Sequence, residues 1–194
     1  MTPTYGHFSY IKSIPSDNAE IGLPKLPSSR AMYSKWPNKR VGSPKNLFST
    51  LKFLLDENTL EVIDYLSDNQ DVLNFKDLKK YSDRLKNSQN LTHQRDCIYL
   101  VKGKIGGFPV VVAAFDFRFM GGSMGKSAGN AFVKGAQIAV DQKSSFITIP
   151  SSGGARMQEG IISLMQMPRT IAAIQMLEEA KLPHIVLLTN PTTG

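Results

Sequence analysis

Two glycines and an alanine separate an apolar run from an amphipathic run in SSGGARMQEG, residues 151–160. A simple turn needs about one glycine, whereas a backbone that approaches a ligand closely needs several small residues. We expect Gly153, Gly154 and Ala155 to open a helix, where the first N–H groups lack partners and the dipole adds positive charge. Such N–H groups form an oxyanion hole for a thioester carbonyl, and tight strand-to-helix packing is the alternative interpretation.

A second small-residue segment, RFMGGSMGKSAG (118–129), contains MGGSMGKS, which ends in Gly-Lys-Ser like a phosphate-binding loop, but Met120 stands where that loop needs glycine. Its glycines also lack the spacing of a dinucleotide-binding fingerprint. Ser151 and Ser152 precede the glycines of their loop, so they do not form a serine nucleophile elbow. For His93 and His184 we expect surface or packing roles. Catalysis by backbone N–H groups is the remaining interpretation.

Both segments follow β-rich runs, and a third such run precedes the end of the chain. The three predicted strands are PVVVAAFDF (109–117), SFITIP (145–150) and HIVLLT (184–189). Helical patterns alternate with them at 130–143, 156–167 and, after a break at Pro168, 169–182. Alternation of this kind predicts an α/β fold with parallel strands and right-handed crossovers. All the small-residue loops then lie at the carboxyl ends of the strands, the usual ligand side.

Two further helices are predicted upstream of these strands. A docking helix with a turn is expected within 47–66, and an exposed helix rich in ion pairs within 74–96. The apolar residues that define their inner faces are Leu47, Leu51, Leu54 and Leu55 in the first, and Phe75, Leu78, Tyr81 and Leu85 in the second.

Length and composition limit the possible classes of protein. With 194 residues and 41% hydrophobic content, the chain predicts one domain, or one domain plus a tail. No apolar run suits a membrane span or a secretory signal. Cys97 is the single cysteine, which excludes an intramolecular disulfide and a four-thiolate zinc site. A cytoplasmic location fits best.

The net charge of +7 is concentrated at the start of the chain. Residues 1–46 carry seven basic and two acidic groups, hence +5, and they hold six of the eleven prolines. We expect a poorly ordered tail there. An RNA-binding arm or a targeting peptide is the alternative, so nucleic acid is a partner only through this segment.

Four motifs in order resemble the β subunit of the carboxyltransferase of bacterial acetyl-CoA carboxylase. They are FDFRFMGGSMG (115–125), SGGARMQEG (152–160), SLMQMPRT (163–170) and LTNPTTG (188–194), within a similarity that covers residues 47–194. The resemblance implies a crotonase-like (ClpP/crotonase) fold with a β-β-α spiral core. It also implies transfer of a carboxyl group from carboxybiotin, held on a separate carrier protein, to acetyl-CoA. The product is malonyl-CoA for fatty acid biosynthesis.

The resemblance also implies site residues and partners. Backbone N–H groups of Gly153 and Gly154, with Ala155 beside them, would stabilise the enolate, and the biotin ureido nitrogen would take the methyl proton. The expected partners are the carboxyltransferase α subunit in an α2β2-type heterotetramer, the biotin carboxyl carrier protein and biotin carboxylase. ATP is used by the complex and not at this subunit. Arg156 and Glu159 are expected to be scaffold that pairs locally or orients the loop. The acyl-CoA groove would be lined by Gly121, Gly122, Ser123, Met124 and Gly125.

The chain departs from the family pattern in several places. No cysteine precedes Cys97, so the zinc ribbon of the bacterial family and its metal are not expected. Asn190 replaces an aspartate, and Lys126 and Ser127 are unusual for the family. Because the family continues beyond the position of Gly194, residues 47–194 are expected to be a partial carboxyltransferase domain, incomplete at the C-terminus and inactive in isolation. A truncated non-catalytic paralogue that binds acyl-CoA or a partner subunit is the alternative.

Overall fold

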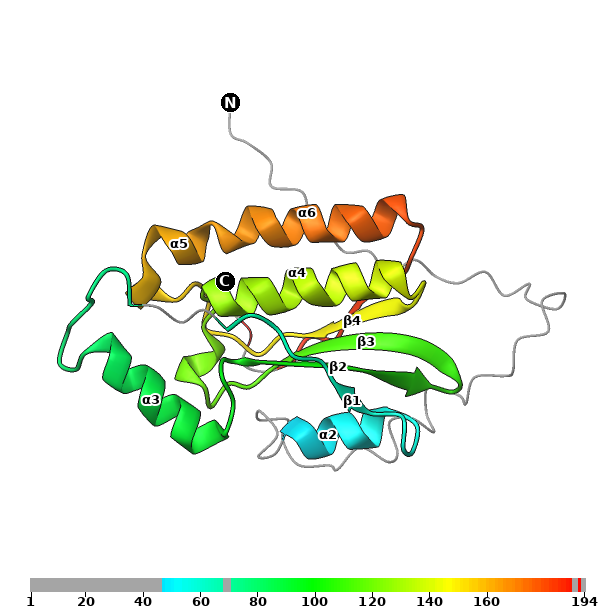
Figure 1. The fold of residues 1–194 in the computed structure, drawn as a ribbon, viewed down its shortest axis with the longest axis horizontal. Helices are drawn as coiled ribbons and strands as arrows, with labels where there is room; N and C mark the ends of the chain where they lie inside the picture. The colour runs from blue at the N-terminus through cyan, green and yellow to red at the C-terminus, as the bar shows by residue number, and fades with distance from the viewer. Residues whose placement is uncertain (1–46, 68–70, 190–191, 193–194) are drawn as a thin grey trace, which may run out of the picture. The chain divides into compact units, whose positions relative to one another are not determined.

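A five-stranded mixed sheet forms the centre of the computed structural model, which describes residues 47–67, 71–189 and 192 (Figure 1). The strands lie in chain order and are β1 (Glu61–Val62), β2 (Ile98–Ile105), β3 (Phe108–Phe115), β4 (Ser145–Ile149) and β5 (His184–Val186). β3, β4 and β5 are parallel, which confirms the predicted parallel strands, while β1, β2 and β3 are antiparallel neighbours. The predictions for residues 1–46 and for Asn190 and Gly194 lie outside the described residues.

The antiparallel hairpin of β2 and β3 has no counterpart in the sequence-based prediction. Gly106 and Gly107 form its turn with φ of 60° and 84°, a region that glycine enters without steric cost. The Asp56 carboxylate accepts hydrogen bonds from both of their N–H groups, at 2.9 and 2.8 Å. These bonds attach the turn to the segment that follows the first helix.

Helices cover both faces of the sheet (Figure 1). α4 (Lys126–Asp141) packs on one face with α6 (Gln166–Glu179) outside it, and α2 (Leu47–Leu54) packs on the other. β3 is buried on both sides, because Val111, Ala113 and Phe115 join the α4 core while the intervening residues join the α2 core. Strands buried on both faces read as continuous apolar runs, which is why PVVVAAF was recognisable.

The helices upstream of the sheet confirm the prediction in part. Leu47, Leu51 and Leu55 are buried, as the spacing predicted. α3 (Tyr81–Thr92) begins seven residues after the predicted start at 74, and Leu78 is 95% exposed, so its predicted inward position is wrong. The reason is local: a bridge between Lys76 and Lys80 holds the segment before α3 out of a helical conformation.

The helices that follow β3 and β4 also differ from their predicted limits. α4 begins at Lys126 rather than 130. After β4 the chain forms a 3₁₀ turn, η2 (Met157–Glu159), then the short α5 (Ile161–Leu164) and α6. Pro168 does not break a helix, because it lies in the first turn of α6, where a backbone N–H has no partner to lose. No helix of the described part is long and apolar enough to span a bilayer.

Candidate functional site

The two glycine-containing loops, 121–125 after β3 and 153–156 after β4, run side by side at the carboxyl ends of their strands. Gly153 N–H donates to Gly121 O at 2.9 Å, and Met124 N–H donates to Gly154 O at 2.8 Å. Arg156 N–H then donates to Met124 O at 2.9 Å, which completes a parallel bridge between Met124 and Ala155. The structure therefore brings both predicted sets of site residues together.

The loop of residues 121–125 requires glycine at position 122. The φ of Gly122 is 64°, and a Cβ atom there would lie 1.9 Å from Ser151 O. No side-chain rearrangement can relieve a contact with a backbone oxygen. The glycine therefore allows the two loops to touch.

The prediction that Gly153, Gly154 and Ala155 open a helix is wrong. These residues are bridged to the neighbouring loop, and the first helical turn, η2, begins only at Met157. The N–H groups of Gly153 and Gly154 are occupied, by Gly121 O and by Ser152 Oγ at 3.0 Å. Ala155 N–H has no hydrogen-bond partner in the part of the chain that is described. Of the three predicted donors, Ala155 is therefore the one whose N–H remains available.

A cleft of about 500 Å³ opens beside Ala155. Its described lining contains three basic side chains, two methionines and no aspartate, glutamate or histidine. The residues are Lys79, Arg84, Asn87, Ser88, Arg118, Met120, Ser123, Ala155, Met157 and Gln158. The cleft is thus lined by Ala155 and by basic side chains, and that lining contains no carboxylate or imidazole to act as a general base.

A fully buried arginine holds the two loops in position. Arg156 has 0% exposure and forms two hydrogen bonds with the Asp96 carboxylate, at 2.7 and 2.9 Å. It also donates to Ser123 O at 2.8 Å and to Glu159 Oε1 at 3.1 Å. Burial alone would lower the pKa of Arg156, but the hydrogen bonds and charge of Asp96 raise it well above its ordinary value. The guanidinium is therefore charged and links the loop of Ser123 to its own loop.

Glu159 extends this network to the start of α4. Its Oε2 accepts a hydrogen bond from Lys126 N–H at 2.6 Å, and its Oε1 accepts one from Tyr81 Oη at 2.6 Å. Gly125, the N-cap residue of α4, has no side chain with which to cap the helix, and a Cβ there would lie 2.3 Å from Glu159 Oε1. Glu159 therefore replaces the missing cap. The predicted scaffold roles of Arg156 and Glu159 are confirmed.

Sequence reasoning missed the partners of these two residues. Asp96 comes from a segment in which no motif was recognised, and Tyr81 was predicted only as an inner-face residue of its helix; both are fully buried. Asp116 was likewise unassigned: it follows β3 directly and pairs with Arg118 at 2.6 Å. Its position as a charged residue within the apolar run FDF is the one sequence signal that could have indicated Asp116.

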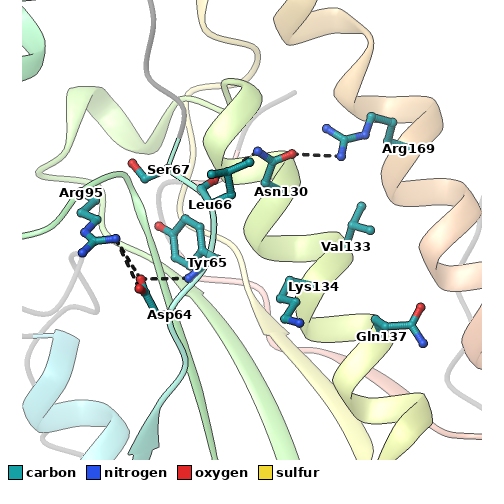
Figure 2. Close-up of a pocket in the computed structure, with 10 residues that line it drawn as sticks. All are labelled: Asp64, Tyr65, Leu66, Ser67, Arg95, Asn130, Val133, Lys134, Gln137 and Arg169. Carbon is teal, nitrogen blue, oxygen red and sulfur yellow. Dashed lines mark hydrogen bonds and ion pairs between the residues drawn. The ribbon is translucent and has the colours of Figure 1, made fainter.

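A second hollow, of about 740 Å³, lies between residues 64–67 and α4 (Figure 2). Its polar contacts include Arg95 with Asp64 at 3.0 Å, Tyr65 N–H with Asp64 at 3.0 Å and Arg169 with Asn130 at 3.0 Å (Figure 2). Its lining includes neither glycine loop, so it holds none of the predicted site residues.

His184 has the packing role that was predicted. Its ring stacks on Phe146 with 5.6 Å between centroids, and burial lowers its pKa. Among the described residues no cluster of His, Cys, Asp and Glu is arranged to hold a metal ion.

Comparison with known proteins identifies the family. The model of the carboxyl transferase domain matches residues 58–194. The chain belongs to the carboxyl transferase domain family. This carboxyl transferase chain is 54% identical over 144 residues to the acetyl-coenzyme A carboxylase carboxyl transferase subunit beta of Bradyrhizobium diazoefficiens, a match covering 74% of this chain and 46% of the relative. The subunit of Rhodopseudomonas palustris strain TIE-1 is 56% identical over 124 residues, 64% of this chain and 38% of the relative. The chain thus spans less than half the length of these curated relatives.

Solved structures confirm the predicted fold class, a crotonase-like α/β fold. Transcarboxylase 12S, solved with methylmalonyl-coenzyme A, superposes with a TM-score of 0.57 at 25% identity, over 74% of this carboxyl transferase chain and 26% of the other. The Pseudomonas malonate decarboxylase MdcD-MdcE heterodimer gives a TM-score of 0.54 at 20% identity, over 76% and 53% of the two chains. The geranyl-CoA carboxylase beta subunit of P. aeruginosa gives 0.52 at 19% identity, over 81% and 26%.

Proposed function

We propose that this chain acts as the β subunit of the carboxyltransferase of acetyl-CoA carboxylase. It would transfer a carboxyl group from carboxybiotin to acetyl-CoA, forming malonyl-CoA for fatty acid biosynthesis. Identity above 50% to subunits of that name supports the assignment. The structural observation that carries it is the pairing of loops 121–125 and 153–156, which leaves the N–H of Ala155, a residue that lines a cleft, without a partner among the described residues. No comparison favours the non-catalytic alternative.

In this proposal Ala155 N–H donates to the thioester oxygen as the enolate forms. One such donor typically contributes about 10²- to 10³-fold in rate, because it is already oriented when charge develops. Gly153 and Gly154 remain in the site for a different reason from the predicted one. Their N–H groups bind Gly121 O and Ser152 Oγ, and this holds the next residue in register. Residues 121–125 would form the wall against which the acyl-CoA lies.

The methyl proton of acetyl-CoA needs an acceptor, and the described lining of the cleft contains no carboxylate or imidazole. Carboxybiotin supplies the carboxyl group and, once that group has left, a basic ureido nitrogen. The chain itself would bind and orient acetyl-CoA. The proposed partners are the α subunit, the biotin carboxyl carrier protein and biotin carboxylase, and the proposed location is the cytoplasm. ATP would be consumed at another subunit.

A chimera tests the proposal independently of where this chain begins and ends. The 144 aligned residues of this chain would replace those of the Bradyrhizobium diazoefficiens subunit, and the product would be mixed with that organism's α subunit. We expect malonyl-CoA-dependent carboxylation of biocytin within about tenfold of the parent rate, since only part of the transition-state stabilisation, about 1.4 kcal/mol, would then be lost. A chimera that folds and assembles but shows no turnover would overturn the proposal.

A further inference from the structure

The cleft beside Ala155 has a charge arrangement that backbone catalysis does not require. Arg118 from the loop after β3, Lys79 from the segment before α3, and Arg84 from α3 all line it, and no acidic residue does so among the described lining. An enolate oxygen is served by N–H donors alone. Arg118 and Arg84 are paired with Asp116 and Asp77, which are not in that lining, so the wall of the cleft is basic and suits a second anionic group on the ligand.

Arg118 is oriented before any ligand binds. The Asp116 carboxylate, which is 1% exposed, accepts hydrogen bonds from Arg118 Nη2 at 2.6 Å and from Arg118 Nε at 3.0 Å. The Arg118 side chain itself is 37% exposed. Asp116 also accepts Arg118 N–H at 2.9 Å, so the backbone and the side chain are fixed together. A guanidinium held in this way loses little conformational entropy when it binds a planar carboxylate or a phosphate.

Asp77 organises the two other basic residues of the lining, Lys79 and Arg84, in a similar manner. It receives Arg84 Nη2 at 2.6 and 2.7 Å, and it accepts Lys79 N–H at 2.9 Å. Arg84 Nε is buried and has no hydrogen-bond partner, the one such side-chain atom among the described residues. A buried donor without an acceptor is costly, and an anionic oxygen could satisfy this one only after the Arg84 side chain had shifted to expose it.

Distance distinguishes the possible anionic groups. A volume of about 500 Å³ corresponds to a sphere roughly 10 Å across. In a malonyl thioester the carboxylate carbon lies two bonds from the thioester carbonyl carbon, about 2.5 Å away, whereas the phosphates of CoA lie beyond the whole pantetheine arm. A thioester carbonyl at Ala155 and its own carboxylate both fit this cleft.

We propose that Arg118, together with Lys79 and Arg84, binds the carboxylate of the malonyl thioester whose carbonyl oxygen lies at Ala155 N–H. The inference rests on the proposed function and adds to it the residues that recognise the newly transferred carboxyl group. The malonyl carboxylate and the phosphates of CoA are both oxyanions, so the experiment must distinguish between them.

Binding of four thioesters to the full chain, measured by isothermal titration calorimetry, tests the proposal. The ligands are acetyl-CoA, malonyl-CoA, S-acetyl-pantetheine and S-malonyl-pantetheine. Arg118→Met retains the length of the side chain and removes its charge. Lys79→Met repeats the test at a residue that forms no ion pair within the described part of the chain. Arg95→Met is the matched control, because Arg95 lies outside the cleft and pairs with an exposed Asp64.

We expect Arg118→Met to weaken both malonyl thioesters about tenfold and both acetyl thioesters less than twofold, since a charge-assisted hydrogen bond is lost only with the carboxylate. Lys79→Met should act in the same direction, and Arg95→Met should change none of the four. Equal weakening of both CoA esters, with no change for the pantetheine esters, would overturn the proposal that these residues bind the malonyl carboxylate. It would show that they bind a phosphate of CoA instead. Unchanged affinities in both cleft variants, or no binding of any thioester to the unmodified chain, would overturn the site altogether. Turnover of the chimera tests the proposed function separately.

Discussion

Removing the partner of the buried Arg156 should be among the most destabilising single changes in this chain. Arg156 and Asp96 are both 0% exposed, and two short hydrogen bonds join them. Asp96→Ala would leave a charged guanidinium in the core, a change that costs about 3–5 kcal/mol in comparable pairs. Glu159, 3.1 Å from Arg156 Nη1, compensates part of that charge, so we expect about 3 kcal/mol.

Urea unfolding followed by circular dichroism measures this cost. With a slope of about 2 kcal/mol per molar urea, Asp96→Ala should lower the midpoint by about 1.5 M. Asp64→Ala is the matched control, because Asp64 pairs with Arg95 where the two side chains are 80% and 68% exposed. That variant should shift the midpoint by less than about 0.5 M. A midpoint for Asp96→Ala as close to wild type as that of Asp64→Ala would refute the buried network as the support of the loops.

Three further outcomes are expected. Gly122→Ala should destabilise the fold by about 3 kcal/mol, because its Cβ would lie 1.9 Å from Ser151 O. Gly106→Ala is the control: its φ is also positive, at 60°, but its Cβ would meet open space, so it should cost about 1 kcal/mol. Equal urea midpoints for the two variants would contradict this. Hydrogen bonds from Gly107 and Gly106 N–H lower the pKa of Asp56 below 3.8, so its contribution to stability is present above that pH and is lost as the pH falls through the lowered value. Asp56→Asn should therefore reduce the loss of folding stability at acidic pH, and an Asp56 pKa of 3.8 or higher, measured by NMR, would argue against this. In the active chimera, Ala155→Pro removes one N–H and should lower kcat about 10²-fold with acetyl-CoA affinity retained; a kcat within threefold of the parent would contradict the donor role.

The fold was predictable where burial leaves a periodic or continuous apolar pattern. β3 and β4 are buried on both faces, and α2 presents leucines at helical spacing, so each was recognised. β2 was missed because its second half carries Lys102 and Lys104 among apolar residues, which disguises a strand with one exposed end. The start of α3 was misplaced for a related reason: Leu78 follows the helical spacing, yet the bridge of Lys76 to Lys80 exposes it.

The candidate site was predictable in its membership and not in its conformation. Small residues in SGGAR indicate close backbone approach, and the structure shows that the approach is to the neighbouring loop through Gly121 and Met124. Spacing along one chain cannot reveal which N–H groups another loop will occupy. We therefore propose Ala155 rather than Gly153 or Gly154 as the donor, because its backbone is held by a bridge to Met124, about thirty residues earlier in the chain.

The contacts of Arg156 explain why this arginine directly follows the small residues of SGGAR. Its backbone N–H binds Met124 O, while its side chain binds Ser123 O and the Asp96 carboxylate. One residue thus fixes the register of both loops, from the backbone on one side and from the buried guanidinium on the other. Lysine could supply the charge but not the planar fork that reaches Asp96 and Ser123 together. Arg156→Lys should for this reason retain more stability than Asp96→Ala and still loosen the loops, which hydrogen exchange at Met124 N–H would detect as faster exchange. Protection at Met124 equal to wild type would mean that the backbone bridge alone holds the register.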